Sequence, residues 1–390
     1  MENPFKNLFK IKDSRVVGID IGTSAVKIVQ LKKKGNKAVL ETYGSISLGS
    51  YDQADVGKAV TNLSGTRMIE ALSDLLKEST VTTKQSCVSI PLNSSLISTI
   101  ELPLVNDKEL KEMVPLEARK YIPVPISDVS LDWTVLSREE HKIQKPKKVS
   151  STEANSIESK GMMKTDGNVP QENQPRSKLT VLIVAIHNEA LKKFNEYNRK
   201  NGLEPSFFEI EIFSTMRAVL DQGAEPVMIF DLGAASTKLY IIENGVIKIS
   251  HSVNKGSQDI TIAISKAYGV PFEKAEIIKR SLEVSGKKAD KEFADVVTNS
   301  LEYIFSESNR VILNYQTKYS KTLSKVILVG GGVGIKGFID LAKTNFQVEA
   351  VLGNPFSKIE TPAFLDNVFK TIGPEFSVAV GVALRGLQEV

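Results

Sequence analysis

The chain has 390 residues, of which 41% are hydrophobic and 25% charged, and a net charge of +4; this length suits two lobes better than one ordinary core, and the composition is that of a globular protein. No apolar run approaches the ~20 residues of a membrane span, and the small net charge gives no case for nucleic acid as the main partner. A single cysteine, Cys87, excludes an internal disulfide, and the N-terminal MENPFKNLFKIK lacks the apolar core of a signal peptide, so we expect a cytoplasmic protein.

The first segment predicts a β-meander followed by a helix. Strands are expected near 16–20, 25–32 and 38–47, and a helical pattern covers 57–78. The apolar, β-branched runs SCVSIPL and LISTIELPL predict two further strands. Because Cys87 lies in the first of these runs, we expect its thiol to be unreactive.

An insertion-like stretch follows, with the order strand, helix, strand, strand. The run NDKELKEMVPLEARKYIP has helical spacing and an N-cap candidate at Asn106 or Asp107, and Pro115 is expected to kink it, split it or mark its true start. The strands VSLDWTVLSR and KLTVLIVAI come next, and then a helix that ends at Gly202. Between those strands, residues 139–177 lack core-forming side chains and predict a flexible tip, whose early lysines offer contact with an anionic membrane as the alternative.

The second half of the chain begins with the strand VMIFD and a hairpin that reaches about residue 252. Helical patterns follow over 259–268 and over PFEKAEIIKRSL, where Pro271 marks a helix start. The run DVVTNSLEYIFSESNRVILNYQ predicts a long amphipathic helix. The run SKVILVGGGVGIKGFIDL then predicts a buried strand, three glycines and a helix.

An eight-residue motif occurs twice. Asp20 to Lys27 reads DIGTSAVK, and Asp231 to Lys238 reads DLGAASTK, and in each copy an Asp ends a strand and a Gly follows two residues later. Glycine lets backbone amides approach an anion, hydroxyl side chains add donors, and the Asp can hold Mg²⁺ through its waters. One copy alone also describes an ordinary hairpin turn. Two matched copies predict related half-domains that face one nucleotide, with Lys27 and Lys238 pointing to solvent.

The glycine triplet predicts a second kind of nucleotide contact. Gly330, Gly331 and Gly332 follow a strand and precede a helix, so a flat ligand can lie close to the backbone at the helix N-terminus. Such a turn is common in α/β folds, and its position after the second phosphate loop strengthens the functional interpretation.

In this order, the two loops and the triplet resemble the actin-like ATPase superfamily. FEIEIFSTMRAVL resembles its first connecting segment, in which the position of Glu211 orients the attacking water, and Glu276, Lys279 and Arg280 resemble the helix that holds adenosine. The alternatives remain open: Glu211 simply enters a helix, and Lys279 and Arg280 form an exposed helix face.

Within that superfamily, LPLVNDKELKEMVPLEARKYIPVPISDVSLDWTVL and FEIEIFSTMRA resemble the PilM family of type IV pilus assembly. The resemblance implies an α/β, actin-like ATPase fold of two related lobes with a strand-helix-strand-strand inserted subdomain. The implied domains are a first lobe at 1–90 and 203–222, an inserted subdomain at 91–202 with its flexible tip at 139–177, a second lobe at 223–365, and a C-terminal helix at 366–390 that packs on the first lobe.

The resemblance also implies a cytoplasmic scaffold at the inner face of the cytoplasmic membrane. It would bind ATP and Mg²⁺, turn ATP over slowly at most, and hold the cytoplasmic tail of a PilN-like membrane protein. Ala235 and Lys255 depart from the family pattern and predict a weaker second phosphate grip. Glu211 is the implied water-orienting residue, Asp20 and Asp231 the Mg²⁺ residues, and the implied nucleotide-binding residues are Asp20, Gly22, Thr23, Ser24, Asp231, Gly233, Ser236, Gly256, Glu276, Lys279, Arg280, Gly330, Gly331 and Gly332.

Two other functions compete with this interpretation. An FtsA-like division protein would end in an amphipathic membrane helix, whereas this sequence ends at GVALRGLQEV, directly after its last predicted packing helix. A sugar or acetate kinase would need a general base for the acceptor hydroxyl and a larger substrate pocket, for which the sequence offers no candidate.

Overall fold

The computed structural model describes residues 14–52, 57–60, 63–139, 178–221, 223, 225–287 and 289–389. The chain divides into two compact units, a larger one of Met1–Ser95 with His187–Val390 and a smaller one of Leu96–Ile186. The N-terminal segment through residue 13 and nearly all of the predicted tip, from residue 140 onward, lie outside the described residues.

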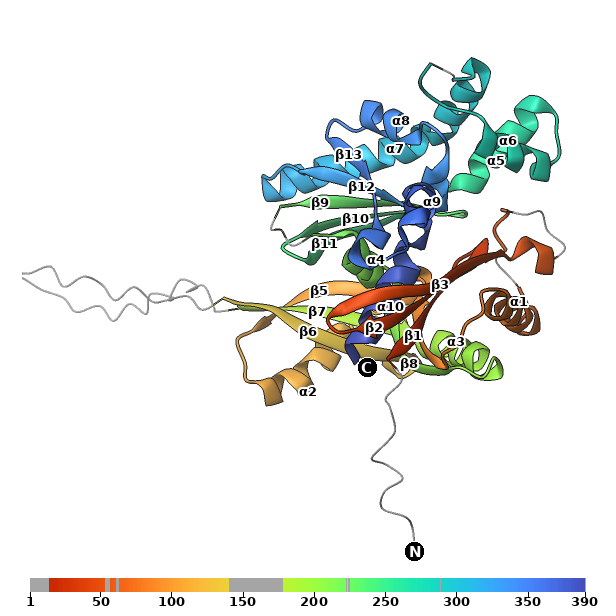
Figure 1. Ribbon diagram of the computed structural model, residues 1–390. Helices are drawn as coiled ribbons and strands as arrows, with labels where there is room; N and C mark the ends of the chain where they lie inside the picture. Colours follow the sequence, from red (N-terminus) through yellow and green to blue (C-terminus); the bar gives the residue numbers. More distant parts are fainter. Residues whose placement is uncertain are drawn as a thin grey trace, which may run out of the picture. The chain divides into compact units, whose positions relative to one another are not determined.

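The larger unit contains two five-stranded sheets with the same strand plan (Figure 1). In each sheet three strands form an antiparallel meander, and two more extend its first strand in parallel. The first sheet has the order β3-β2-β1-β4-β8, with β1 Arg15–Ile21, β2 Ala25–Lys34, β3 Lys37–Ser47, β4 Gln85–Ile90 and β8 Glu204–Ile210. The second has the order β11-β10-β9-β12-β13, with β9 Val227–Leu232, β10 Thr237–Glu243, β11 Val246–Val253, β12 Lys325–Val329 and β13 Glu349–Leu352.

Helices complete each sheet to a lobe. The first lobe, as named here, is the first sheet with the helices that contact it or one another, namely α1 Gly65–Glu78, α3 Asn188–Lys200, α4 Glu211–Val219 and α10 Ser377–Glu389. The second lobe is the second sheet with α5 Ser257–Tyr268, α6 Phe272–Ser281, α7 Lys291–Tyr319 and α8 Phe338–Asn345. The short α9, Asp366–Ile372, contributes Phe369 to the core of the first lobe.

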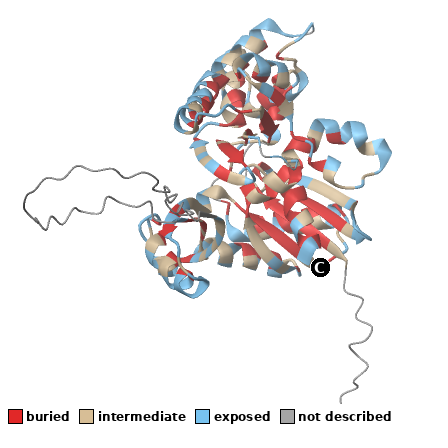
Figure 2. Ribbon diagram, turned by 90° about the vertical axis from the view of Figure 1, so that its left-hand side faces the viewer, coloured by how far each residue is buried: buried red, intermediate tan, exposed pale blue. Residues whose placement is uncertain are grey.

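Each lobe has its own hydrophobic core. In the second lobe, Phe230 of β9 stacks on Phe305 of α7 with ring centroids 6.1 Å apart. In the first lobe, α10 is buried along most of its length against β1, β2 and α4, as expected for a helix rich in small apolar residues. Figure 2 shows the buried residues concentrated along the strands and the inward helix faces.

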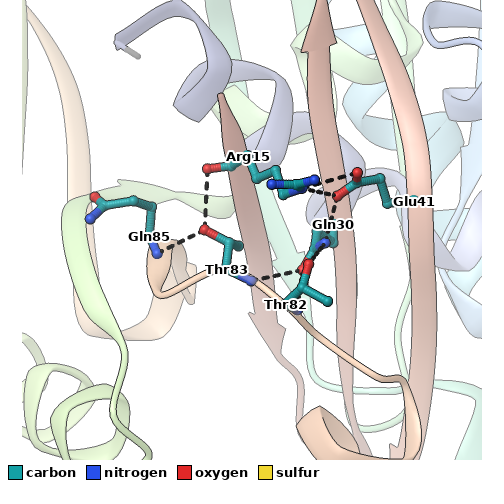
Figure 3. Close-up of polar contacts among 6 residues, drawn as sticks. All are labelled: Arg15, Gln30, Glu41, Thr82, Thr83 and Gln85. Atoms are coloured by element: carbon teal, nitrogen blue, oxygen red, sulfur yellow. Dashed lines mark hydrogen bonds and ion pairs between the residues drawn. The ribbon is translucent and has the colours of Figure 1, made fainter. Parts of the chain in front are cut away.

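The first sheet also carries a polar network around a buried glutamine (Figure 3). The Gln30 side chain is 1% exposed, and its amide nitrogen donates to Glu41 Oε2 at 2.7 Å and to Thr82 Oγ1 at 2.8 Å. Its carbonyl oxygen accepts from the Thr82 amide at 2.9 Å, and Arg15 pairs with Glu41 at 3.0 Å. A buried amide is tolerated because each side of it is paired, and it joins β2 and β3 to the loop before β4.

The smaller unit has the predicted order of strand, helix, strand, strand. It consists of β5 Ser95–Pro103, α2 Asp107–Ala118, β6 Val129–Glu139 and β7 Lys178–His187, with the sheet order β5-β7-β6. Asn106 is the N-cap of α2, with a complete capping box to Glu109. Pro115 neither splits the helix nor starts it; it lies in the last turn, so the hydrogen bond that its missing N–H cannot make is lost only at the end of the helix.

The helix predicted over 57–78 begins later than expected. Ser64 is the N-cap of α1, and its hydroxyl accepts from the Arg67 amide at 3.4 Å. The described residues ahead of it are held in non-helical contacts: the Val60 amide donates to the Thr23 carbonyl at 2.8 Å, and the Ala59 amide donates to Gln258 at 3.2 Å. Contacts with the tip of the first motif and with the second lobe therefore override the local helical pattern.

Candidate functional site

The register of two hairpins places the acidic and basic ends of each repeated motif side by side. Asp20 of β1 is paired with Lys27 of β2, and Asp231 of β9 is paired with Lys238 of β10. Directly opposed residues of an antiparallel pair project from the same face of the sheet. The prediction that both lysines point to solvent is therefore wrong for Lys238, which is largely buried, and both lysines line the cavity described below.

The tips of the two hairpins have the same tight turn. The Gly22 amide donates to the Ala25 carbonyl and the Gly233 amide donates to the Ser236 carbonyl, each at 3.0 Å. A Cβ on Gly233 would lie 2.9 Å from the Ser236 oxygen, so a side chain there would force the turn open. The repeat is thus structural as well as sequential.

The two tips line one cavity of about 600 Å³ between the lobes. It brings together residues from both motif copies, the connecting segment, α6 and the glycine triplet. The predicted site residues that line it are Asp20, Gly22, Thr23, Ser24, Glu211, Asp231, Gly233, Ser236, Glu276, Lys279, Arg280, Gly330, Gly331 and Gly332.

Gly256 is absent from that lining. It is the N-cap of α5, where a Cβ would lie 2.4 Å from the Ala234 carbonyl oxygen. The amides that follow it, of Ser257 and Gln258, donate to the carbonyls of Gly233 and Ala234 at 2.8 and 3.0 Å. Gly256 therefore packs against the tip of the second motif, and its neighbour Ser257 lines the cavity in its stead.

Of the two motif carboxylates, Asp20 is buried and Asp231 is half-buried. The Ser89 hydroxyl donates to Asp20 at 3.0 Å, yet burial, with a contribution from Glu211, raises the pKa of Asp20 above its usual value despite nearby Lys27. Burial also raises the pKa of Asp231 to about 6, and the charges of Glu211 and Asp20 add to this effect against that of Lys238. The ionised form of both carboxylates is therefore disfavoured, and a nearby cation would stabilise it.

An ion pair between two lining residues of the cavity joins the lobes. Lys238 Nζ lies 2.7 Å from Glu211 Oε1 and 2.7 Å from Oε2, and the Leu92 amide donates to Oε1 at 2.7 Å. Burial opposes the charge of Lys238, but Glu211 and Asp231 more than offset this and raise its pKa. Glu211 is also the first residue of α4. It therefore begins a helix, as one alternative predicted, and its side chain also lines the cavity.

The adenosine candidates form a second buried cluster. Lys279 Nζ lies 2.6 Å from Glu276 Oε2 and donates to Thr261 Oγ1 at 2.8 Å and to the Ser257 carbonyl at 3.2 Å. Burial opposes ionisation of Glu276, but Lys279 and Thr261 keep its pKa below the usual value. Lys279 is thus a buried partner of Glu276, whereas the Arg280 side chain is 71% exposed and pairs with Glu276 at 2.9 Å.

The glycine triplet approaches the second motif closely. Gly330 has φ of +89°, and a Cβ on it would lie 2.4 Å from Asp231 Oδ1. Gly331 and Gly332 continue into a short 3₁₀ turn, Gly331–Gly334, and α8 begins only at Phe338. The expected helix N-terminus directly after the triplet is therefore wrong, because the backbone first turns in 3₁₀ geometry.

Sequence reasoning missed several lining residues. Lys27 and Lys238 could have been found from the seven-residue offset, which a hairpin with this turn converts into cross-strand pairing. No sequence signal indicated Gly57, whose Cβ would lie 2.9 Å from Glu276 Cδ and whose φ is +87°. The same holds for Ser47, which lines the cavity with a buried hydroxyl that has no hydrogen-bond partner among the described residues.

These residues fit a nucleotide with a hydrated divalent cation. The unpartnered Ser47 hydroxyl, the hydroxyl-bearing tips and Lys27 suit phosphate oxygens, and the raised pKa of Asp20 and Asp231 suits a nearby cation. Over the described part of the chain there is no group of three His, Cys, Asp or Glu residues that could hold a metal. Mg²⁺ keeps several of its waters and needs only one or two carboxylates, so two acids are sufficient.

No helix within the described ranges is long and apolar enough to cross a membrane.

Comparisons with known proteins agree with this architecture. The chain resembles the solved "PilM-PilN type IV pilus biogenesis complex" at 22% identity and a TM-score of 0.72, over 95% of this chain and 98% of that chain. It also resembles the ethanolamine utilization protein EutJ from Carboxydothermus hydrogenoformans, at 16% identity and a TM-score of 0.52, over 95% and 89% of the two chains. MreB5 of Spiroplasma citri bound to AMPPNP matches at 12% identity and a TM-score of 0.50, over 96% and 97%.

These likenesses confirm the predicted actin-like ATPase fold. A family model described as type IV pilus assembly protein PilM matches residues 18–166 and 167–387, which together span most of the sequence. The chain therefore belongs to the PilM family of type IV pilus assembly proteins.

Proposed function

We propose that this protein binds Mg-ATP in the cavity between its lobes and acts as a nucleotide-responsive scaffold of type IV pilus or related secretion assembly. One observation carries the proposal: both copies of the repeated motif line a single cavity, with Asp20 and Asp231 close enough for their charges to interact. Family membership favours this scaffold over an FtsA-like division protein and over a small-molecule kinase.

Each part of the cavity has a proposed task. Thr23, Ser24 and Ser236 donate to phosphate oxygens, and Asp20 and Asp231 hold Mg²⁺ through its water ligands. The cation would supply positive charge against the phosphates. Gly22 and Gly233 keep the tips tight, as their turns indicate.

Adenosine lies against the glycine triplet in this proposal. The backbone of Gly330, Gly331 and Gly332 leaves space for a flat base, and the Glu276 carboxylate beside Arg280 faces the ribose. Lys279 acts through Glu276, because its ammonium already has three partners. Glu211 orients the attacking water during slow turnover.

The partner we propose is the cytoplasmic tail of a PilN-like inner-membrane protein. A solved structure with the same fold is described as a PilM-PilN complex, and the family model supports the same role here. Membrane association at the inner face would then come through this partner, and closure of the lobes on ATP or ADP would change its affinity.

Titration of a fluorescent ATP analogue with and without Mg²⁺ tests the nucleotide site. Asp20→Ala is expected to weaken Mg-dependent binding by about tenfold or more, because a charge-assisted contact is worth roughly 1.5–3 kcal/mol. Asp295→Ala, an exposed acid on α7 outside the cavity, is the matched control and should bind like wild type. Equal affinity of wild type and Asp20→Ala would remove the site assignment.

A further inference from the structure

The two copies of the motif differ in what their lysines contact. Lys27 and Lys238 occupy equivalent registers, each opposite the motif Asp. Lys238 is held by both oxygens of Glu211, whereas Lys27 makes no ion pair within the part of the chain that the structure describes. Of the two motif lysines, Lys27 is therefore available to a phosphate directly, and Lys238 is already engaged.

Lys238 is paired with Glu211, the carboxylate that we propose to orient the attacking water. Glu211 Oε1 accepts from the Leu92 amide and Oε2 from Lys238, so both oxygens have a partner. The Glu211 and Lys238 side chains are only 10% and 20% exposed, so the pair is poorly screened by solvent. Each carboxylate oxygen can accept two hydrogen bonds, but Lys238 occupies a site on both oxygens and neutralises their charge, so its departure would free Glu211 to orient a water molecule.

We propose that the Lys238 ammonium moves from Glu211 to the terminal phosphate when ATP binds. This inference rests on the proposed function. A terminal phosphate carries more charge than a carboxylate and offers three acceptor oxygens, and the flexible stem of lysine lets the ammonium reach either group. ADP lacks the terminal phosphate, so in the ADP complex Lys238 stays on Glu211. Lys238 is then a specificity-determining residue that distinguishes ATP from ADP, and it exposes Glu211 to water only when ATP is present.

A purely structural role predicts different behaviour. If the ion pair only latched the lobes together, removing either partner would open the cavity in the same way and shift nucleotide affinity in the same direction. Partner exchange predicts opposite directions. Loss of the lysine removes a contact to the terminal phosphate, whereas loss of the carboxylate charge frees the lysine for that contact and removes a repulsion.

The test is calorimetric titration of the full chain with Mg-AMPPNP and with Mg-ADP. Lys238→Met is expected to weaken AMPPNP binding by about tenfold or more, with ADP binding changed by about twofold at most. Glu211→Gln, which keeps an acceptor for the Leu92 amide, is expected to raise the ratio of AMPPNP affinity to ADP affinity by about threefold or more. Lys248→Met, an exposed lysine on β11 outside the cavity, is the matched control.

The outcomes separate the two proposals. Changes of the same sign in Lys238→Met and Glu211→Gln, or equal changes for AMPPNP and ADP, would overturn partner exchange while the nucleotide site stands. A wild-type chain that binds neither nucleotide would overturn the proposed function itself. If Lys238→Met proves unfolded, Glu211→Gln decides alone, because misfolding cannot produce tighter AMPPNP binding.

Discussion

The surroundings of Cys87 determine how reactive its thiol is. It lies in β4 and is fully buried beneath α10, so that a Cβ on Gly386 would lie 2.7 Å from its sulfur. Burial, with a smaller contribution from Glu209, raises the pKa of the thiol to about 12. Since the thiolate is the reactive form, the native thiol stays protonated and inert over the neutral pH range.

We expect a disulfide exchange reagent at pH 8 to leave the native protein unmodified over minutes and to modify one thiol per chain in urea. The single cysteine makes the assignment unambiguous. Only above the raised pKa, or when α10 moves away, would the native thiol react. Rapid modification of the folded chain at pH 8 would mean that α10 does not cover β4.

The cavity-lining residues that could be predicted from the sequence are those in short motifs. Asp20, Asp231 and Gly330 were found because their chemistry and their local turn are encoded within a few residues. Ser47 and Gly57 were not, since their place at the cavity depends on strand β3 and on a loop that reaches α6 from the other lobe. Lys238 was misplaced because its contact, Glu211, belongs to the other lobe.

Among the elements, α10 depends most on small residues. A Cβ on Gly381 would lie 1.8 Å from the Ser214 carbonyl oxygen of α4, and one on Gly18 of β1 would lie 2.4 Å from the Ala379 carbonyl oxygen. The Arg217 guanidinium also donates to the Gly381 carbonyl at 3.0 Å. Backbone contact of this kind lets α10 fill the space between β1 and α4.

Gly381→Ala is therefore expected to lower the free energy of unfolding by about 1–3 kcal/mol, the usual cost of overpacking, although alanine is the better helix former. Urea unfolding followed by circular dichroism measures it. Gln388→Ala, an exposed change in the same helix, should stay within about 0.5 kcal/mol of wild type. A Gly381→Ala variant as stable as wild type would show that α4 and α10 are farther apart than described.

Element boundaries were predicted least well where a contact from elsewhere competes with local pattern. The helix over 57–78 had the right type and end, but its start was wrong because the Val60 amide pairs with Thr23. The helix of the smaller unit had its cap at Asn106 as expected, because a capping box is a purely local feature. Propensity alone could not show that Pro115 would be accommodated in the last turn.

On the scale of the whole molecule, the duplicated motif predicted the duplicated sheets. Both sheets have the same order and the same mixture of antiparallel and parallel pairs, which follows from one hairpin plan used twice. The sequence could not reveal that α3 belongs to the larger unit with the first lobe, because its packing against α1 and β8 joins distant segments.

A scaffold with one nucleotide cavity and one partner site must obey reciprocal coupling. If AMPPNP changes the affinity for a PilN-like tail peptide by some factor relative to ADP, the peptide must change the preference for AMPPNP over ADP by the same factor. We expect a factor of at least about fivefold, the lower end of common allosteric couplings. The measurement is a set of peptide titrations without nucleotide, with ADP and with AMPPNP, followed by nucleotide titrations with and without peptide.

Asp20→Ala separates coupling from simple peptide binding, because the substituted side chain lines the proposed nucleotide cavity. This variant should bind the peptide with wild-type nucleotide-free affinity and show no response to either nucleotide, while a scrambled peptide binds neither protein. Equal peptide affinity in all three nucleotide states of wild type would leave a scaffold that binds nucleotide without responding to it. Absence of peptide binding in every state would instead reject the PilN-like partner, and because the nucleotide titrations are independent, the cavity assignment would stand.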